Sequence, residues 1–146
     1  MILWPVLFFG HSSCPDDIKP ILETQIEDFI VNHNIKNFLL GDHGNFDLLV
    51  LKCIKKLAIK HDISYKVVLS YMPKYNNIFA SDPNSIFPEE LALVPKKFAI
   101  NYRNRYLIEK SQYFITFITH SFGNAAKFTQ EAIKKGKNVT NIADLL

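Results

Sequence analysis

Short apolar segments alternate with longer amphipathic segments along this chain, and this alternation limits the fold more than any other feature. Short runs rich in β-branched and aromatic residues predict strands, and apolar residues three or four positions apart predict helices. Strands that alternate with helices form parallel sheets through right-handed crossovers. We therefore expect an α/β fold, a single Rossmann-like domain over residues 1–146, with a mostly parallel five-stranded sheet and helices on both faces. The expected strands are residues 2–9, 37–40, 65–71, 113–119 and 138–142, and the expected helices are residues 16–33, 46–61, 98–111 and 124–135.

Local signals refine the ends of these elements. Pro5 has no N–H group, so the paired part of the first strand is expected to begin near Val6. Asp16 and Asp17 stand where an N-cap and a first-turn carboxylate are favoured in the first helix. Gly136 suits the residue that follows the last helix.

Residues 72–97 interrupt the alternation, because they contain four prolines and little periodicity. A connection of this length inside a compact domain is usually functional. We expect a long loop or a lid here, and a surface insertion without a role is the alternative.

The composition and charge exclude several classes of protein. A formal charge of +3 on 146 residues does not indicate nucleic-acid binding, which calls for a clustered basic face. No apolar run approaches the roughly 20 residues of a membrane span, and the first apolar run lacks the flanks of a signal peptide. We therefore expect a cytoplasmic protein that does not bind a membrane, with Cys14 and Cys53 as reduced thiols.

Three short polar turns that contain glycine follow expected strands and precede expected helices. In open α/β sheets the ligand lies beyond the carboxyl ends of the strands. Glycine permits close approach of the backbone, and a helix N-terminus favours negative charge. We expect a phosphate or another anion near Gly123 and Asn124, and a second part of the ligand along the middle turn. The turns are residues 10–13, 41–45 and 120–124.

Three histidines, His11, His43 and His120, also fall at these strand ends. Imidazole suits zinc, but neither an HxxxH nor a CxxC spacing accompanies them. We therefore expect no metal and no cofactor, and we expect these side chains to bind the ligand or the backbone.

Residues 101–106 place two arginines among aromatic side chains. Arginine binds phosphate with two hydrogen bonds, and tyrosine offers a stacking face for a base. A solvated basic helix face is the alternative, with Glu109 paired to Arg105. Asp42 and Asp47 are the carboxylates nearest the strand ends, and Asp47 is expected to cap or orient a loop.

Together, these segments resemble the SLOG superfamily, the Rossmann-like relatives of the LOG "lysine decarboxylase-like" proteins. The resemblance spans nearly the whole chain and is nearest to small single-domain bacterial and phage members. The motifs that carry it are Phe8-Phe9-Gly10-His11, Gly41-Asp42-His43-Gly44-Asn45-Phe46-Asp47, Phe87-Pro88-Glu89, Val94-Pro95-Lys96-Lys97-Phe98-Ala99-Ile100, Arg103-Asn104-Arg105-Tyr106 and Ile118-Thr119-His120-Ser121-Phe122-Gly123-Asn124-Ala125-Ala126.

The resemblance implies a nucleotide-type ligand over the strand ends, and a homodimer or a larger homo-oligomer. SLOG domains are associated with nucleotide-derived signals, including ADP-ribose-type signals in bacterial immunity. The LOG branch hydrolyses the N-glycosidic bond of nucleoside monophosphates with the help of a glutamate. Here Phe128 stands in place of that glutamate, Ser12 in place of a common arginine, and Asn124 in place of a second glycine.

We therefore expect a protein that binds a nucleotide or an ADP-ribose-like signal without turnover, as a sensor or a sequestering protein. The alternative is an N-glycosidase or phosphoribohydrolase, with Asp42, Asp47 or Glu109 as the acidic group. The expected ligand-binding residues are Gly10, His11, Ser12, Gly41, Asp42, His43, Gly44, Asn45, Asp47, Arg103, Asn104, His120, Ser121, Phe122, Gly123, Asn124 and Ala125.

Overall fold

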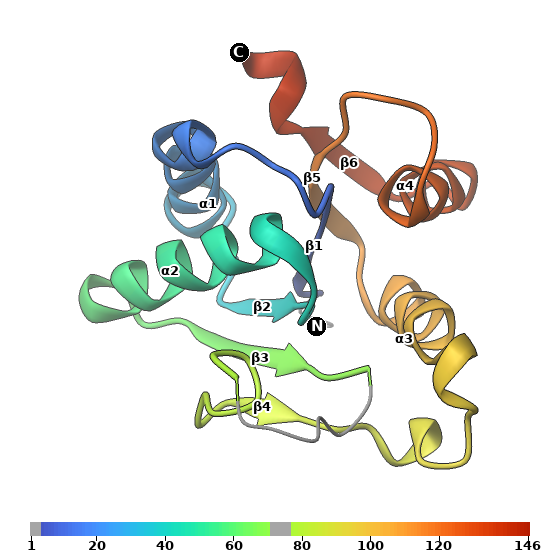
Figure 1. Ribbon diagram of the computed structural model, residues 1–146. Coiled ribbons are helices and arrows are strands. Elements are labelled where there is room, and N and C mark those ends of the chain that lie inside the picture. Colours follow the sequence, from blue (N-terminus) through green and yellow to red (C-terminus); the bar gives the residue numbers. More distant parts are fainter. Residues whose placement is uncertain (1–3, 71–76) are drawn as a thin grey trace.

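The computed structural model describes residues 4–70 and 77–146, which form one six-stranded parallel sheet (Figure 1). The order of the strands is β4-β3-β2-β1-β5-β6. All five neighbouring pairs are parallel. The strands are β1 (Val6–Gly10), β2 (Asn37–Leu40), β3 (Ser64–Val68), β4 (Ser85–Ile86), β5 (Tyr113–Phe117) and β6 (Asn138–Asn141).

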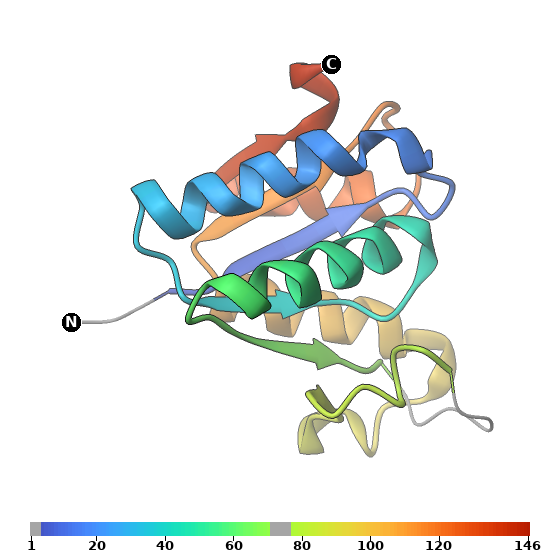
Figure 2. The same ribbon diagram turned by 90° about the vertical axis from the view of Figure 1, so that its left-hand side faces the viewer.

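Helices cover both faces of this sheet, which confirms the expected α/β class (Figures 1 and 2). Helices α1 (Lys19–Asn32) and α2 (Gly44–Lys60) cover one face, and α3 (Lys96–Lys110) and α4 (Asn124–Lys134) cover the other. In the described part of the chain, none of the helices is both long and apolar enough to cross a membrane. Within residues 4–70 and 77–146, three short 3-10 helices complete the elements, at Asp16–Ile18, Glu89–Leu91 and Ile142–Leu145.

The direction of strand addition reverses beside β1. From β1 to β4 the chain adds strands toward one edge, and it then returns to place β5 on the other side of β1. This reversal is why α1 and α2 lie on one face while α3 and α4 lie on the other. The carboxyl ends of β1 and β5 therefore border the crevice where a doubly wound sheet binds its ligand.

Strand β1 is buried on both faces, as the central strand of a parallel sheet should be. Val6 and Phe8 face the apolar layer under α1 and α2, whereas Leu7 and Phe9 face the layer under α3 and α4. All four side chains are buried. The uninterrupted apolar sequence of this strand thus follows from its central position.

The sixth strand, β4, lies within the segment expected to be a loop. It is only two residues long and pairs Ser85 with Val67 and Ile86 with Val68, so it is too short to produce a period of two in the sequence. Residues 72–76 of the expected loop lie outside the described residues. The rest includes β4, a 3-10 helix and the start of α3, which begins two residues before the expected position.

The buried carboxylate of Asp82 anchors residues 77–86 to the sheet. It accepts hydrogen bonds from the hydroxyl of Tyr65 (3.1 Å) and the N–H of Asn84 (2.8 Å), and Lys55 lies 3.7 Å away. The backbone N–H of Val67 also donates to Asn84. This part of the segment is therefore packed structure and not a loose insertion.

The prediction that Asp16 and Asp17 form the N-cap and first turn of the first helix is wrong. Asp16 and Asp17 lie in a 3-10 turn, and α1 begins only at Lys19, with Pro20 in its first turn and no side-chain cap. Asp16 instead accepts a hydrogen bond from the side chain of Asn45 (2.8 Å). The other boundaries differ from expectation by a few residues, and the expected strand residues 2, 3 and 71 lie outside the described residues.

Replacing Gly10 with alanine should destabilise the fold. A Cβ atom at this position would lie 2.1 Å from Cγ of Phe46, whose side chain is fully buried. Overpacking of this kind costs about 1–3 kcal/mol. Urea denaturation of Gly10→Ala should show this loss in the free energy of unfolding. The exposed Ser12→Ala serves as the control, and equal stability of the two variants would contradict the packing argument.

Candidate functional site

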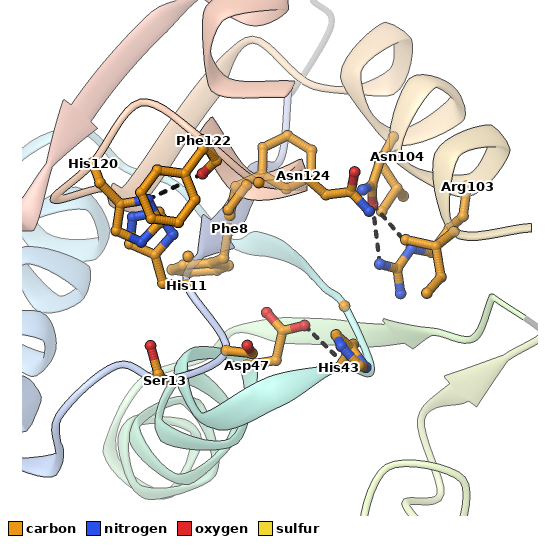
Figure 3. Close-up of a pocket in the computed structure, with 18 residues that line it drawn as sticks. Phe8, His11, Ser13, His43, Asp47, Arg103, Asn104, His120, Phe122 and Asn124 are labelled. Carbon is orange, nitrogen blue, oxygen red and sulfur yellow. Dashed lines mark hydrogen bonds between the residues drawn. The ribbon is translucent and has the colours of Figure 1, made fainter. Parts of the chain in front are cut away.

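A cavity of about 390 Å³ opens at the carboxyl ends of β1 and β5, where the strand order reverses (Figure 3). The three turns that were singled out in the sequence all contribute to it, together with α3. It therefore lies where a ligand site was expected. The expected residues that line it are Gly10, His11, Ser12, Gly41, His43, Asp47, Arg103, Asn104, His120, Phe122, Gly123, Asn124 and Ala125.

Three aromatic rings form a continuous stack at one side of this cavity (Figure 3). The rings of His11 and His120 are 3.6 Å apart with planes inclined by 12°, and those of His120 and Phe122 are 3.7 Å apart and inclined by 16°. His11 is buried, whereas Phe122 is 71% exposed. The stack thus runs from the core to the surface and ends in a ring that solvent can reach.

The backbone fixes which nitrogen of each histidine carries a hydrogen. Nε2 of His11 accepts from the N–H of Thr119 (3.0 Å), so its hydrogen is on Nδ1. Nδ1 of His120 lies 3.1 Å from the carbonyl of Phe122 and donates to it. Burial, together with the charge of His120, lowers the pKa of His11, so both the hydrogen bond and the burial favour a neutral ring.

Asp47, in the first turn of α2, is a buried carboxyl group within the cavity wall. One oxygen, Oδ2, accepts from the N–H of His43 (3.0 Å). Burial raises the pKa of Asp47 to about 7, against the opposing effects of Arg103 and the His43 hydrogen bond, and Asp42 raises it further. The group therefore titrates near neutral pH, unlike an ordinary aspartate.

Arg103 is buried beside the cavity and forms an ion pair with Asp42. Asp42 also accepts from the backbone N–H of Ser70 (3.1 Å), and Arg103 donates to the carbonyl of Val68 (3.3 Å). The pair thus ties the segments that follow β2 and β3 to α3. Asp42 itself is not among the residues that line the cavity, and the contacts of its carboxylate are those of this ion pair and of Ser70.

The guanidinium of Arg103 also orients the neighbouring Asn104. Its Nε and Nη2 both donate to Oδ1 of Asn104, at 3.2 and 3.0 Å. Because that oxygen is occupied, the amide NH2 group is left for the cavity (Figure 3). Asn104 therefore presents donors rather than an acceptor to a ligand.

The N-terminus of α4 lies at the opposite wall from Asp47 (Figure 3). Gly123 has φ = 92°, and no side chain caps this helix. The N–H groups of the first turn have no partner within a helix, and Asn124 and Ala125 line the cavity. This edge of the cavity therefore favours negative charge.

Gly44 and Asn45, two of the expected ligand-binding residues, pack the first two turns against each other. Gly44 has φ = 89°, and a Cβ there would lie 2.6 Å from Cα of Ser12. The N–H of Asn45 donates to the Ser12 carbonyl (2.9 Å), and its side chain donates to the Cys14 carbonyl (2.6 Å). Gly44 and Asn45 do not line the cavity, and Ser121 does not line it either.

Glu109 does not reach this cavity. Six helical positions after Arg103 correspond to a rotation of about 240°, which directs the two residues to different faces. Glu109 instead borders a second hollow on the outer face of α3, with Phe98, Tyr102 and Arg105. Arg105 lies 3.6 Å from Glu131, so the expected Glu109–Arg105 pair is replaced by a contact with α4.

Five residues outside the expected ligand-binding set complete the wall: Phe8, Phe9, Ser13, Ile100 and Leu107. Of these, Ser13 belongs to the first of the three turns. Ile100 and Leu107 lie three or four positions from Arg103 and Asn104, so helical spacing could have found them. The two phenylalanines carried no such signal, because an apolar strand residue usually belongs to the core.

The described residues hold no cluster of three or more histidine, cysteine or acidic side chains that could bind a metal ion. Cys14 is a buried free thiol whose pKa is raised to about 12 by burial and by Asp16 and Asp17. It is therefore not an activated nucleophile. No family model matches the chain, and no curated protein matches it significantly. The function is accordingly argued from this geometry.

Asp47→Asn should change the pH dependence of stability. The folded carboxyl keeps its proton up to about pH 7, whereas the unfolded one loses it near pH 4, so stability falls as the pH rises between these values. Asparagine has no such titration and can still accept from His43. Relative to the wild type, the variant should gain about 1–3 kcal/mol between pH 5 and pH 8.

Urea denaturation at both pH values measures this difference. Asp62→Asn, at an exposed position after α2, is the matched control and should show no such gain. If the free energies of unfolding of Asp47→Asn and the wild type differ by the same amount at both pH values, the raised pKa of Asp47 is contradicted.

Asp42→Ala should destabilise the protein strongly, because it leaves the buried guanidinium of Arg103 without its carboxylate. Breaking a buried pair in this way costs about 3–5 kcal/mol. Chemical denaturation measures the free energy of unfolding, and Asp144→Ala, at an exposed position, is the control. A loss below about 1 kcal/mol, as for an exposed pair, would show that the pair does not hold the strand ends together.

Proposed function

We propose that the protein binds a nucleotide-derived small molecule, a nucleotide or an ADP-ribose-like signal, in this cavity and acts as a sensor or sequestering protein without turnover. One observation carries the proposal: a stack of aromatic rings and an uncapped helix N-terminus line the same cavity. The rings suit a base, and the N–H groups suit a phosphate.

The size and the charge of the cavity support this assignment. About 390 Å³ is within the range of small-molecule sites. Arg103 already has a carboxylate partner, so an anion would be bound chiefly by N–H donors. Affinity should then depend only weakly on salt, in contrast with nucleic-acid binding.

We infer the absence of turnover from the places of the acidic groups and the cysteines that could act as catalysts. Asp42 is engaged by Arg103 and Ser70, and Glu109 borders a different hollow. Cys14 and Cys53 are buried, and their pKa values are raised to about 12 and about 11. Asp47 is left as the one expected acid that lines the cavity.

Asp47 is also the reason to keep an alternative, an N-glycosidase or phosphoribohydrolase acting on a nucleotide. A general acid or base works best when its pKa is near the working pH, and the pKa of Asp47 is raised to about 7. Groups with such shifts are often found at active sites.

The resemblance to the SLOG superfamily supports the wider role that we propose, which is nucleotide signalling in the cytoplasm of a bacterium or in phage defence. It also suggests a homodimer or a larger homo-oligomer. The exposed rings of Phe98 and Tyr102 on α3 offer surface for contact between subunits.

Native mass spectrometry of the purified protein, followed by denaturation, tests the proposal directly. We expect a nucleotide-type molecule to be released intact, and the same spectra give the number of subunits. Protein without a bound molecule is then titrated with nucleoside monophosphates and ADP-ribose, and one of them should raise the melting temperature. Failure of every compound in the panel would contradict the proposal.

Analysis of the products separates binding from turnover. A free base released by the wild type and not by Asp47→Asn would establish the enzyme and overturn the proposal of binding alone. Intact ligand after prolonged incubation would support the binder.

A further inference from the structure

Three side chains in the cavity are more than nine-tenths buried, and each keeps a polar atom without a partner among the described residues. They are His11 at 7%, Asp47 at 6% and Asn104 at 4% exposure. Nε2 of His11 and Oδ1 of Asn104 are occupied, so these two residues offer the hydrogens on Nδ1 and Nδ2. None of these three residues has a fully buried side-chain atom that lacks a partner, so the unbonded atoms are accessible from the cavity and available to a ligand.

Asp47 differs from the other two because it offers an acceptor. Its Oδ2 receives the His43 N–H, and Oδ1 faces the cavity (Figure 3). Gly41 packs closely against the occupied oxygen, because a Cβ on that residue would lie 2.6 Å from Oδ2. Oδ1 is therefore the carboxylate oxygen that is left for a ligand.

This access limits the chemistry of the group that Asp47 binds. A phosphate would be repelled by the carboxylate and suits the opposite wall at the start of α4. A fork of two N–H groups, such as the edge of guanine, needs both carboxylate oxygens. A hydroxyl group has one hydrogen to donate and needs one oxygen only.

We propose that Asp47 accepts a hydrogen bond from a ribose hydroxyl of the ligand, so that the cavity selects ribose over deoxyribose. This inference rests on the proposed function, because it names the sugar of the same nucleotide-derived ligand. The phosphate then lies at the N-terminus of α4 and the base beside the ring stack, with the sugar between them. The pairing is specific, because a site built around a hydroxyl rejects an analogue that lacks it.

Calorimetric titration of the wild type with AMP, 2′-deoxy-AMP and 3′-deoxy-AMP at pH 8, where Asp47 is ionised, tests this assignment. At least one deoxy analogue should bind about 10- to 100-fold more weakly than AMP, as expected for a lost hydrogen bond to a charged group. This comparison changes only the ligand, so it does not depend on whether a variant folds.

Asp47→Asn provides the protein-side test. Its amide oxygen should stay on the His43 N–H, which turns the NH2 group toward the cavity and removes the acceptor. The preference for AMP over the deoxy analogue should fall to within about threefold, whereas Asp62→Asn should keep it. Equal binding of AMP and both deoxy analogues to the wild type would overturn the inference and leave the proposed function standing.

Ribose 5-phosphate and 2-deoxyribose 5-phosphate separate the two proposals further. If no nucleotide binds but ribose 5-phosphate does, with a preference that Asp47→Asn abolishes, the nucleotide proposal fails and the ribose assignment holds. If neither the nucleotides nor the sugar phosphates bind, both are overturned.

Discussion

The buried ion pair between Arg103 and Asp42 is the interaction on which the rest of the site depends. A guanidinium in the interior must be matched by charge and hydrogen bonds, and meeting that need draws together α3 and the segments that follow β2 and β3. The same guanidinium holds the amide of Asn104 in one orientation. One electrostatic requirement therefore fixes both the frame of the cavity and the polarity of a group that faces it.

Most of the fold could be predicted from the sequence, because long periodic segments determine it. The parallel sheet, the helices on both faces and the three turns at the strand ends all followed from local patterns. Strand β4 could not be predicted, because two residues carry no periodicity and its pairing with β3 is a tertiary contact. The prediction that Asp16 caps α1 was wrong, because Asp16 lies in a 3-10 turn before the helix and accepts a hydrogen bond from Asn45, a residue 29 positions away.

The sequence predicted where the cavity lies more accurately than it predicted what each residue does there. The turns that follow the strands indicated much of the cavity lining. The basic run at residues 101–106 indicated Arg103, and the family resemblance implied Asn104. The sequence alone does not show which partner each charged group has. Asp42, adjacent to a strand end, forms an ion pair with Arg103, whereas Asp47, five residues later, lines the cavity. Such assignments depend on burial and on contacts between distant segments.

The cavity is divided between distant parts of the chain. Residues 8–47 supply one half and residues 100–125 the other, and the N–H of Thr119 donates to His11 across 108 positions. During synthesis the N-terminal half therefore lacks the other half of the cavity wall until β5 has been added beside β1 and α4 has emerged. A ligand that binds only the complete sheet stabilises the whole domain against unfolding. A ligand bound in this cavity would thus indicate that both halves of the sheet have folded.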